Sequence, residues 1–322
     1  MNLKDVSALD EDGARALLEK IRWPTGPACA HCGDVNVVRL AGKATRPGVF
    51  KCKSKGCRKQ FTVTVGTIFE SSHIPLRTWL MAFALLCGAK KSMSAKQMQR
   101  ALGLGSYQAA WHMAHRIRHA MRAEPLQALL RGVVESDEVW IGAGKPRRRA
   151  KGDPRPPITR EEQASKRVPV MTMIERTSGQ LRRRVLRRAT HANIKAALLE
   201  AVDIRSRLLT DEAGAYQLVG MGFTGGHGTV NHSQYEYAKP DGTHVNSCES
   251  AHALVRRAIM GSWHHVSVKH LPRFMDELEW AWNHRRQTDA ERFMDAVRLT
   301  TGRRLTYASL IADEPEPTLE AE

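Results

Sequence analysis

Three acidic residues in separate parts of the sequence are candidates for binding divalent metal ions. Asp137 lies within GVVESDEVWIG (Gly132–Gly142), Asp211 ends the apolar segment RLLTD, and Glu249 follows later in the chain. Carboxylates are the hard oxygen ligands that Mg²⁺ prefers, and two such ions can activate an attacking oxygen and stabilise a leaving oxygen at phosphorus. The chain has 33 acidic residues, so spacing alone is weak evidence and the elements that carry the acids matter more.

Two of these acids lie in segments with the pattern of β-strands. Because successive strand residues alternate between faces, Glu135 and Asp137 share one face of the first segment. Asp211 ends the second segment, where a carboxylate stands at the edge of a sheet. Alternatives remain for both positions: Glu135 or Glu138 competes with Asp137 for the metal, and Asp211 can instead cap a helix expected over Glu212–Leu218.

The third acid lies in the first turn of a predicted helix. Asn246 opens this helix, so Glu249 is three residues into it. An Asn-x-x-Glu pattern is also a capping box, which alone accounts for the glutamate in structural terms. The residues therefore leave a catalytic and a structural interpretation of Glu249 open.

The cysteines form a second group with chemical potential. Cys29 and Cys32 are separated by two residues, and Cys52 and Cys57 by four. Two such pairs supply four thiolates to a tetrahedral zinc with no open position, which makes the predicted site structural; His31 is an alternative fourth ligand. A segment this short needs the metal in order to fold. The two remaining cysteines are expected to be small buried side chains: Cys87 and Cys248.

Composition points to a nucleic-acid partner. The 322 residues include 50 Lys and Arg against 33 Asp and Glu, a formal charge of +17 that attracts polyanions. A generic basic surface is the alternative explanation. No apolar run is long enough to span a bilayer and the N-terminus is polar, so we expect a cytoplasmic, nucleoid-associated protein without a membrane partner.

The segment Arg77–Met121 is predicted to form consecutive helices. Ser94 caps one helix, Gly103 and Gly105 bracket a turn, and Ser106 begins a second helix, which is helix-turn-helix spacing. The second helix is expected to present a polar and basic face to a DNA major groove. A purely structural helix pair is the alternative. The residues expected on the exposed face are Tyr107, Gln108, His112, His115, Arg116 and Arg118.

Beyond Leu130 the pattern becomes that of an α/β layer. The predicted order is three strands, one helix and a further strand, which is the opening order of a ribonuclease-H-like fold. A basic segment between the first two strands, Lys145–Arg167, includes Arg147, Arg148 and Arg149 and is a candidate phosphate-binding loop, or else a solvated linker. Lys269 is another candidate phosphate contact. The predicted elements are strands 133–141, 168–174 and 180–186, helix 192–202 and strand 207–210.

Several separated motifs together resemble the zinc-ribbon group of bacterial insertion-sequence transposases of the DDE class. The resemblance covers most of the chain, and the blocks occur in the order typical of that group. They are CAHCGD (Cys29–Asp34), RKQFTVTVGTIFESSHIPLRTWL (Arg58–Leu80), ESDEVWIG (Glu135–Gly142), LLTDEAGAY (Leu208–Tyr216), HVNSCES (His244–Ser250), WHHVSVKHL (Trp263–Leu271) and WNHRR (Trp282–Arg286).

The resemblance implies that Asp137, Asp211 and Glu249 bind catalytic Mg²⁺ or Mn²⁺. It further implies DNA cutting, joining of a 3′-hydroxyl to target DNA, and a homodimer or larger assembly on double-stranded DNA. The lysine usual seven residues after the third acid is replaced by Arg256, which shares the helix face of Glu249 and can grip a phosphate. The alternatives are an inactive DNA-binding regulator and a nuclease that cuts without joining.

The expected organisation has four parts. A lead-in helix capped by Asp10 and the zinc ribbon occupy residues 1–67, and the helical DNA-binding region occupies 68–125. The ribonuclease-H-like mixed sheet with flanking helices, an α/β domain, follows over 126–290. A C-terminal helix and an acidic tail complete the chain over 291–322.

Overall fold

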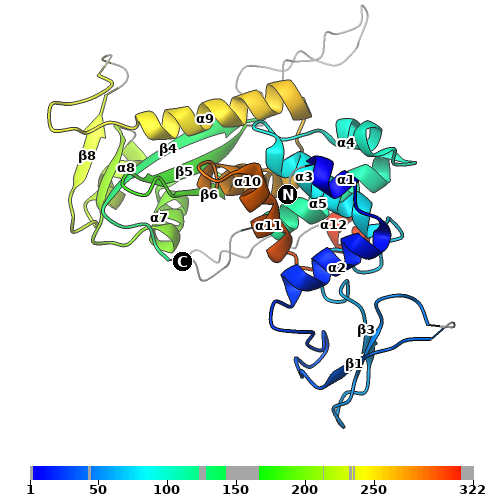
Figure 1. Cartoon of the computed structure of the whole chain (residues 1–322). Coiled ribbons are helices and arrows are strands. Elements are labelled where there is room, and N and C mark those ends of the chain that lie inside the picture. The colour runs from blue at the N-terminus through cyan, green and yellow to red at the C-terminus, as the bar shows by residue number, and fades with distance from the viewer. Residues whose placement is uncertain are drawn as a thin grey trace, which may run out of the picture. The chain divides into compact units, whose positions relative to one another are not determined.

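The computed structural model describes residues 3–42, 45–122, 128–142, 167–212, 214–231, 234 and 236–312. Two compact units divide the chain (Figure 1). The first combines the chain up to Arg122 with the residues from Arg286 onward, and the second is formed by the residues between these positions. The basic loop with Arg147, Arg148 and Arg149 and the acidic tail lie outside the described residues, and the four-part division of the sequence remains a prediction.

The second unit is built on a five-stranded mixed sheet with the order β6-β5-β4-β7-β8. The β4–β5 and β5–β6 pairs are antiparallel, whereas β4–β7 and β7–β8 are parallel. This is a ribonuclease-H-like arrangement, as predicted. The strands are β4 (Val133–Ile141), β5 (Val168–Glu175), β6 (Leu181–Val185), β7 (Arg207–Asp211) and β8 (His227–Val230).

Helices cover both faces of this sheet (Figure 1). One face carries Val134, Met171 and Leu208, which pack with α7 (His191–Ala201) and α8 (Gly214–Gly220). The other carries Val139 and Val170, which pack with α9 and α10. This second layer consists of α9 (Asn246–Ala258), a π-helical turn (Ile259–Trp263), a 3₁₀ turn (Val268–His270) and α10 (Leu271–Asn283).

The first unit contains the predicted run of helices. Ser94 and Ser106 cap α4 and α5 by accepting backbone hydrogen bonds from Gln97 and Ala109. Gly103 ends α4 with φ +63°, a left-handed conformation that glycine adopts without steric cost. The helices are α1 (Leu3–Ser7), α2 (Glu11–Arg22), α3 (Leu76–Gly88), α4 (Ala95–Leu102), α5 (Tyr107–Met121), α11 (Asp289–Arg298) and α12 (Tyr307–Ile311).

A three-stranded antiparallel sheet holds the cysteine segment. Its strands are β1 (Val37–Arg39), β2 (Phe50–Cys52) and β3 (Gln60–Phe61). Phe50 and Phe61 stack with their ring centroids 5.6 Å apart, and the Trp23 ring at the end of α2 packs edge-on against both. This aromatic cluster joins the cysteine segment to the helix that precedes it.

Most predicted elements are present, with one difference in the second unit. In the first unit, the apolar run Phe61–Val65 is a strand only at its start, because β3 ends at Phe61 and the chain then turns. Strand β8 was not predicted, because His-Gly-Thr-Val is short and carries only one strongly apolar side chain. In the part of the chain that the structure describes, no helix has the length and apolarity needed to cross a membrane.

Candidate active site and zinc centre

Asp137 and Asp211 lie side by side on neighbouring parallel strands. The last paired residues of β4 and β7 are Glu135 and Leu209, and the two aspartates each follow two residues later. Alternation therefore places them on the same face of the sheet at the same level. Neighbouring strands run about 4.8 Å apart, so the register brings the two carboxylates together. The face is the one that α9 covers.

The Glu135 carboxylate is buried and holds the beginning of α9. It accepts hydrogen bonds from the backbone N–H of Ser247 at 2.8 Å, from the Ser247 hydroxyl at 2.9 Å and from the backbone N–H of Cys248 at 3.4 Å. The Arg176 guanidinium donates to the same carboxylate at 2.7 Å. The Glu135 carboxylate therefore already accepts hydrogen bonds from the helix terminus and from Arg176. This makes Glu135 a weaker candidate than Asp137 for binding a metal ion.

Glu249 lies on the exposed side of the first turn of α9. Asn246 is the first helical residue, the preceding cap residue is Val245, and no side-chain hydrogen bond is made at that cap. The capping-box interpretation of Asn246 and Glu249 is therefore wrong. Arg256, two turns further along the same helix, is also exposed. Glu249 is therefore accessible to a metal ion and Arg256 to a phosphate, as the sequence interpretation requires.

His252 connects α9 to Asp137. Its Nδ1 lies 3.4 Å from Oδ2 of Asp137, and its side chain is only 2% exposed. Burial, together with the positive charges of Arg183 and Arg256, lowers the pKa of His252 to about 3. The imidazole beside the aspartate is therefore neutral. Sequence reasoning missed this contact, because a histidine three residues after Glu249 has no distinctive pattern.

Glu138 belongs to the opposite face of β4. The Tyr216 hydroxyl from α8 donates a hydrogen bond to the Glu138 carboxylate. The same hydroxyl oxygen lies 3.3 Å from the hydroxyl oxygen of Ser136. The pKa of Glu138 is raised to about 7, chiefly by burial and also by the negative charges of Asp137 and Asp211, against the lowering effect of the tyrosine hydrogen bond. Negative charge is thus concentrated around the two aspartates, where a divalent cation would offset it.

The three predicted acids do not converge as tightly as the cysteines do. Among the described residues, the four cysteines are the only group of three or more His, Cys, Asp or Glu side chains whose ligand atoms approach closely enough to hold one ion. The structure thus brings Asp137 and Asp211 together and sets Glu249 on the adjoining helix. Hard carboxylate donors on one face, with excess negative charge, nevertheless fit the requirements of Mg²⁺ or Mn²⁺.

The cysteine cluster has the dimensions of a zinc centre. The Sγ atoms of Cys29 and Cys57 are 3.8 Å apart, those of Cys32 and Cys52 are 3.7 Å apart, and all four lie within 4.8 Å of one another. Tetrahedral zinc with sulfur ligands at about 2.3 Å requires sulfur separations of roughly 3.8 Å. The alternative ligand His31 instead contacts the carbonyl oxygen of Gln60. The cluster therefore supports a structural Cys₄ zinc.

The predicted DNA-binding face of α5 needs a correction. His115, Arg116 and Arg118 were expected to be exposed, but they are 0%, 5% and 1% exposed. The Arg116 guanidinium donates to the carbonyl oxygen of Glu70 at 2.6 Å and lies over the Trp79 ring. The hydrogen bond and the cation–π contact both offset the cost of burying this charged group. These side chains stabilise the helix packing and do not form an exposed surface.

The other predicted contacts differ in accessibility. Gln108 and Tyr107 at the start of α5 are exposed, whereas His112 is half-buried beside Tyr307. Lys269 is half-buried on the 3₁₀ turn before α10. Arginines 147–149 lie outside the described residues. The beginning of α5 therefore keeps the accessibility that base recognition requires.

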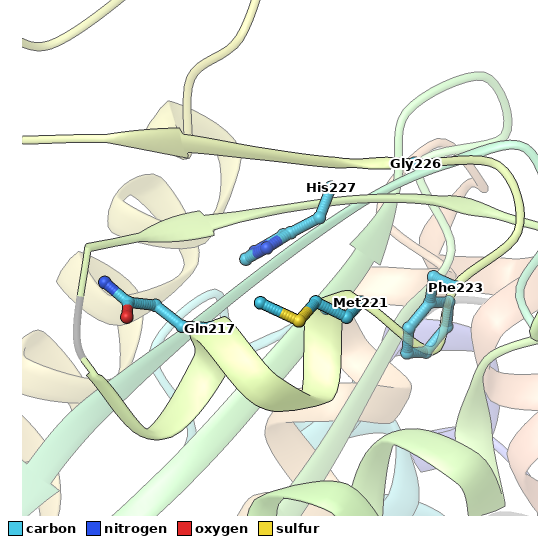
Figure 2. Close-up of a pocket in the computed structure, with 6 residues that line it drawn as sticks. Gln217, Met221, Phe223, Gly226 and His227 are labelled. Atoms are coloured by element: carbon cyan, nitrogen blue, oxygen red, sulfur yellow. The ribbon is translucent and has the colours of Figure 1, made fainter.

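A pocket of about 430 Å³ lies between α8 and β8 and is separate from the acids. Figure 2 shows His227 pointing from β8 toward Gln217 and Met221 on the helix side. His227 Nε2 is 2.9 Å from the hydroxyl of Thr210, which lies on the face of β7 opposite Asp211. A Cβ on Gly220 would lie 2.1 Å from His227 Nδ1, so glycine is required where α8 approaches this strand.

Comparison with known proteins gives two family matches and one relative. An ISXO2-like transposase domain matches residues 129–283, and a transposase zinc-ribbon domain matches residues 9–60. A relative from Halobacterium salinarum, an uncharacterised protein in transposable element ISH50, is 28% identical over 258 residues, which are 77% of this chain and 83% of the relative. The two matched domains follow one another in the order of the cysteine cluster and the five-stranded sheet.

Two solved structures show only a low level of similarity. A pre-cleavage Mos1 transpososome has 16% identity and a TM-score of 0.28 and covers 64% of this chain and 74% of that one. A simian T-cell lymphotropic virus intasome in complex with PP2A regulatory subunit B56 gamma has 9% identity and a TM-score of 0.24 and covers 76% of each. Scores this low carry no conclusion. The two domain matches and the ISH50 relative, in contrast, place the chain in one family: it belongs to the zinc-ribbon group of insertion-sequence DDE transposases.

Proposed function

We propose that this transposase binds the ends of an insertion sequence, cuts the DNA there and joins the freed 3′-hydroxyl to target DNA. Asp137, Asp211 and Glu249 are the ligands of two Mg²⁺ or Mn²⁺ ions, and Arg256 contacts a phosphate. The working species is a homodimer or larger, because two element ends must be held together for joining.

The observation that carries this proposal is the register between β4 and β7. It sets Asp137 and Asp211 at the same level on one face, under the helix whose exposed side carries Glu249. When bound, the two metal ions activate the attacking oxygen and stabilise the leaving oxygen of an in-line displacement. The carboxylates would hold these ions, and through them the anionic phosphodiester. The planar guanidinium of Arg256 can bind its oxygens through two parallel hydrogen bonds.

Binding of DNA before catalysis is assigned to other parts of the chain. The formal charge of +17 favours a polyanion, and the capped helix pair α4–α5 presents Tyr107 and Gln108 at the start of its second helix. In helix-turn-helix proteins this end of the recognition helix contacts base edges. Lys269 and the basic segment with Arg147, Arg148 and Arg149 are candidate phosphate contacts.

The test separates catalysis from folding and from binding. Asp137→Asn, Asp211→Asn and Glu249→Gln each remove one charge from the site, and we expect each to lower Mg²⁺-dependent nicking and joining by several orders of magnitude while DNA binding is kept. The duplex carries an element end, and joining is followed as transfer of that end to a second duplex. Melting of each zinc-loaded variant without Mg²⁺ reports its folding.

The outcomes discriminate between the possible functions. A fully active Glu249→Gln protein would contradict the assignment of the third ligand. Nicking without joining by the wild-type protein would identify a nuclease, and DNA binding without either reaction would identify a regulator. Glu249→Gln should not show the stability loss expected for a broken capping box, because no side-chain hydrogen bond is made at that cap.

A further inference from the structure

Two residues outside the proposed metal site fix the start of the helix that carries Glu249. Glu135 is 0% exposed and accepts three hydrogen bonds from the first turn of α9: two from backbone N–H groups and one from the Ser247 hydroxyl. Without these hydrogen bonds from Ser247 and Cys248 to Glu135, the two backbone N–H groups would have no partner, because the side chain of the cap residue Val245 offers no acceptor. The carboxylate is thus the N-terminal cap of α9, delivered from a strand.

Arg176 ties the same carboxylate to the loop that leads into the helix. Its Nε donates to Glu135 at 2.7 Å, while its two terminal nitrogens each donate at 2.8 Å, to the carbonyl oxygens of Gly242 and His244. One guanidinium therefore connects strand β4, through Glu135, with the residues immediately before α9. All five of its donors lie in one plane, so this arrangement resists rotation of the loop.

The position of Glu135 relates directly to the proposed site. Glu135 and Asp137 share one face of β4, two residues apart, and Glu249 follows the capped residue Ser247 by two positions on α9. On the other side of Glu249, His252 contacts Asp137 at 3.4 Å. The helix is thus attached to the strand on both sides of Glu249, and the Glu135 attachment has the larger number of hydrogen bonds.

We propose that Glu135, held by Arg176, is a positioning residue that sets Glu249 relative to Asp137 and thereby sets the affinity of the site for divalent metal. This inference rests on the proposed function, because it takes Glu249 to be a metal ligand. Glu135 does not bind the ion in this account. Its negative charge also lies at the positive end of the helix dipole, where an anionic side chain stabilises the helix.

The test compares two buried glutamates with the same local role. Glu135→Gln replaces one acceptor oxygen by an NH₂ group, which must face a donor from Ser247 or Arg176. Glu175→Gln is the matched control, because Glu175 also accepts two backbone N–H bonds and one hydroxyl bond, but from the turn residues Thr177 and Ser178. Both substitutions remove the same charge, and only the first affects α9.

The readouts are binding of Mn²⁺, followed by electron paramagnetic resonance on zinc-loaded protein, and hydrogen exchange of the Ser247 and Cys248 amides without Mn²⁺. Loss of a residue that orients a metal ligand typically weakens metal affinity by about 10- to 100-fold, and we expect this for Glu135→Gln. The two amides should also exchange faster. Glu175→Gln should match the wild-type protein in both measurements, whatever stability it loses.

Unchanged Mn²⁺ affinity in a folded Glu135→Gln protein would overturn the proposal. If that variant does not fold, Ser247→Ala removes only the hydroxyl bond, and a smaller but measurable loss of Mn²⁺ affinity is expected; no loss would overturn the proposal equally. Glu249→Gln in the same Mn²⁺ titration distinguishes a failure of the proposed metal site from a failure of the positioning role of Glu135. If it leaves Mn²⁺ affinity unchanged, the proposed metal site itself is wrong, whereas a loss there without a loss in Glu135→Gln rejects the positioning role alone.

Discussion

The rings of Tyr307 and His112 lie 5.4 Å apart, so the short helix α12 covers the middle of α5. Arg303, just before α12, donates to the carbonyl oxygens of His119 and Arg122 at the end of the same helix. The C-terminal segment therefore packs along the part of α5 that the sequence pattern assigned to DNA. Accessible polar side chains remain at the beginning of α5.

This packing predicts different effects for two polar residues of α5. Gln108→Ala should lower affinity for the element end relative to an unrelated duplex by about 1–3 kcal/mol, because an exposed glutamine can read adenine through two hydrogen bonds. Arg116→Ala should instead lower the melting temperature, since this arginine is 5% exposed and bonds to Glu70. Binding titrations with both duplexes and thermal melts of both proteins check this. Equal loss of sequence preference in both variants would contradict it.

Local patterns predicted the elements of this fold better than they predicted which surfaces are free. Ser94, Ser106 and Asp10 cap helices as expected, because a cap and its helix are adjacent in the chain. Strand alternation likewise placed Glu135 and Asp137 on one face. The burial of Arg116 was not predictable, because its partner Glu70 lies 46 residues away in the sequence and a charged side chain is normally expected to be exposed to solvent.

Two helix caps, one of them at the candidate site, show the same limit. The first turn of α3 is capped by Glu11, whose carboxylate accepts from the backbone N–H of Leu76, 65 residues away. The first turn of α9 is capped by Glu135, 112 residues before Ser247. In both cases the residue before the helix, Pro75 or Val245, cannot cap it. The sequence therefore suggested Asn246 as a cap, and only the tertiary fold identifies the distant carboxylate.

The contact between His252 and Asp137 predicts that two amide substitutions have different effects. In His252→Asn the amide nitrogen lies near the position of Nδ1, whereas in His252→Gln it lies near Nε2. Because Nδ1 is the atom 3.4 Å from Asp137, asparagine should keep Mg²⁺-dependent nicking close to that of the wild-type protein, and glutamine should lower it by about tenfold. Melting of the zinc-loaded proteins without Mg²⁺ controls for packing. Equal activity of the two variants would exclude orientation of Asp137 by Nδ1.

The zinc centre predicts different outcomes for two cysteines that are equally buried. Cys52 and Cys87 are both 0% exposed, but only Cys52 belongs to the four-cysteine cluster. Treatment with a mercurial should release about one equivalent of zinc from the wild-type and Cys87→Ala proteins and none from Cys52→Ala. Loss of zinc should also shift the fluorescence of Trp23, which packs against Phe50 and Phe61. A folded wild-type protein without zinc would contradict the assignment.

The last prediction concerns a buried charge pair behind α9. Arg183 on β6 is 4% exposed and donates to the carbonyl oxygen of Ala251, while its Nε and Nη1 have no hydrogen-bond partner among the described residues. Glu279 on α10 is 5% exposed, accepts from the backbone N–H of Arg183 at 2.7 Å, and lies 4.0 Å from Nη1 of Arg182. Burial lowers the pKa of Arg183 to about 10, against the raising effect of Glu279, so the arginine stays charged at neutral pH.

Removing Glu279 alone should cost more stability than removing Glu279 and Arg183 together. Glu279→Leu leaves the charges of Arg183 and Arg182 without this carboxylate, and we expect the free energy of unfolding to fall by about 3–5 kcal/mol. Arg183→Met combined with Glu279→Leu also removes the more deeply buried positive charge and should restore part of this loss, so that the double-mutant cycle gives a favourable coupling energy. Burial raises the pKa of Glu279, which favours its neutral form, so urea unfolding is measured at mildly alkaline pH. Additive losses in the two single variants would show that the charges do not compensate each other.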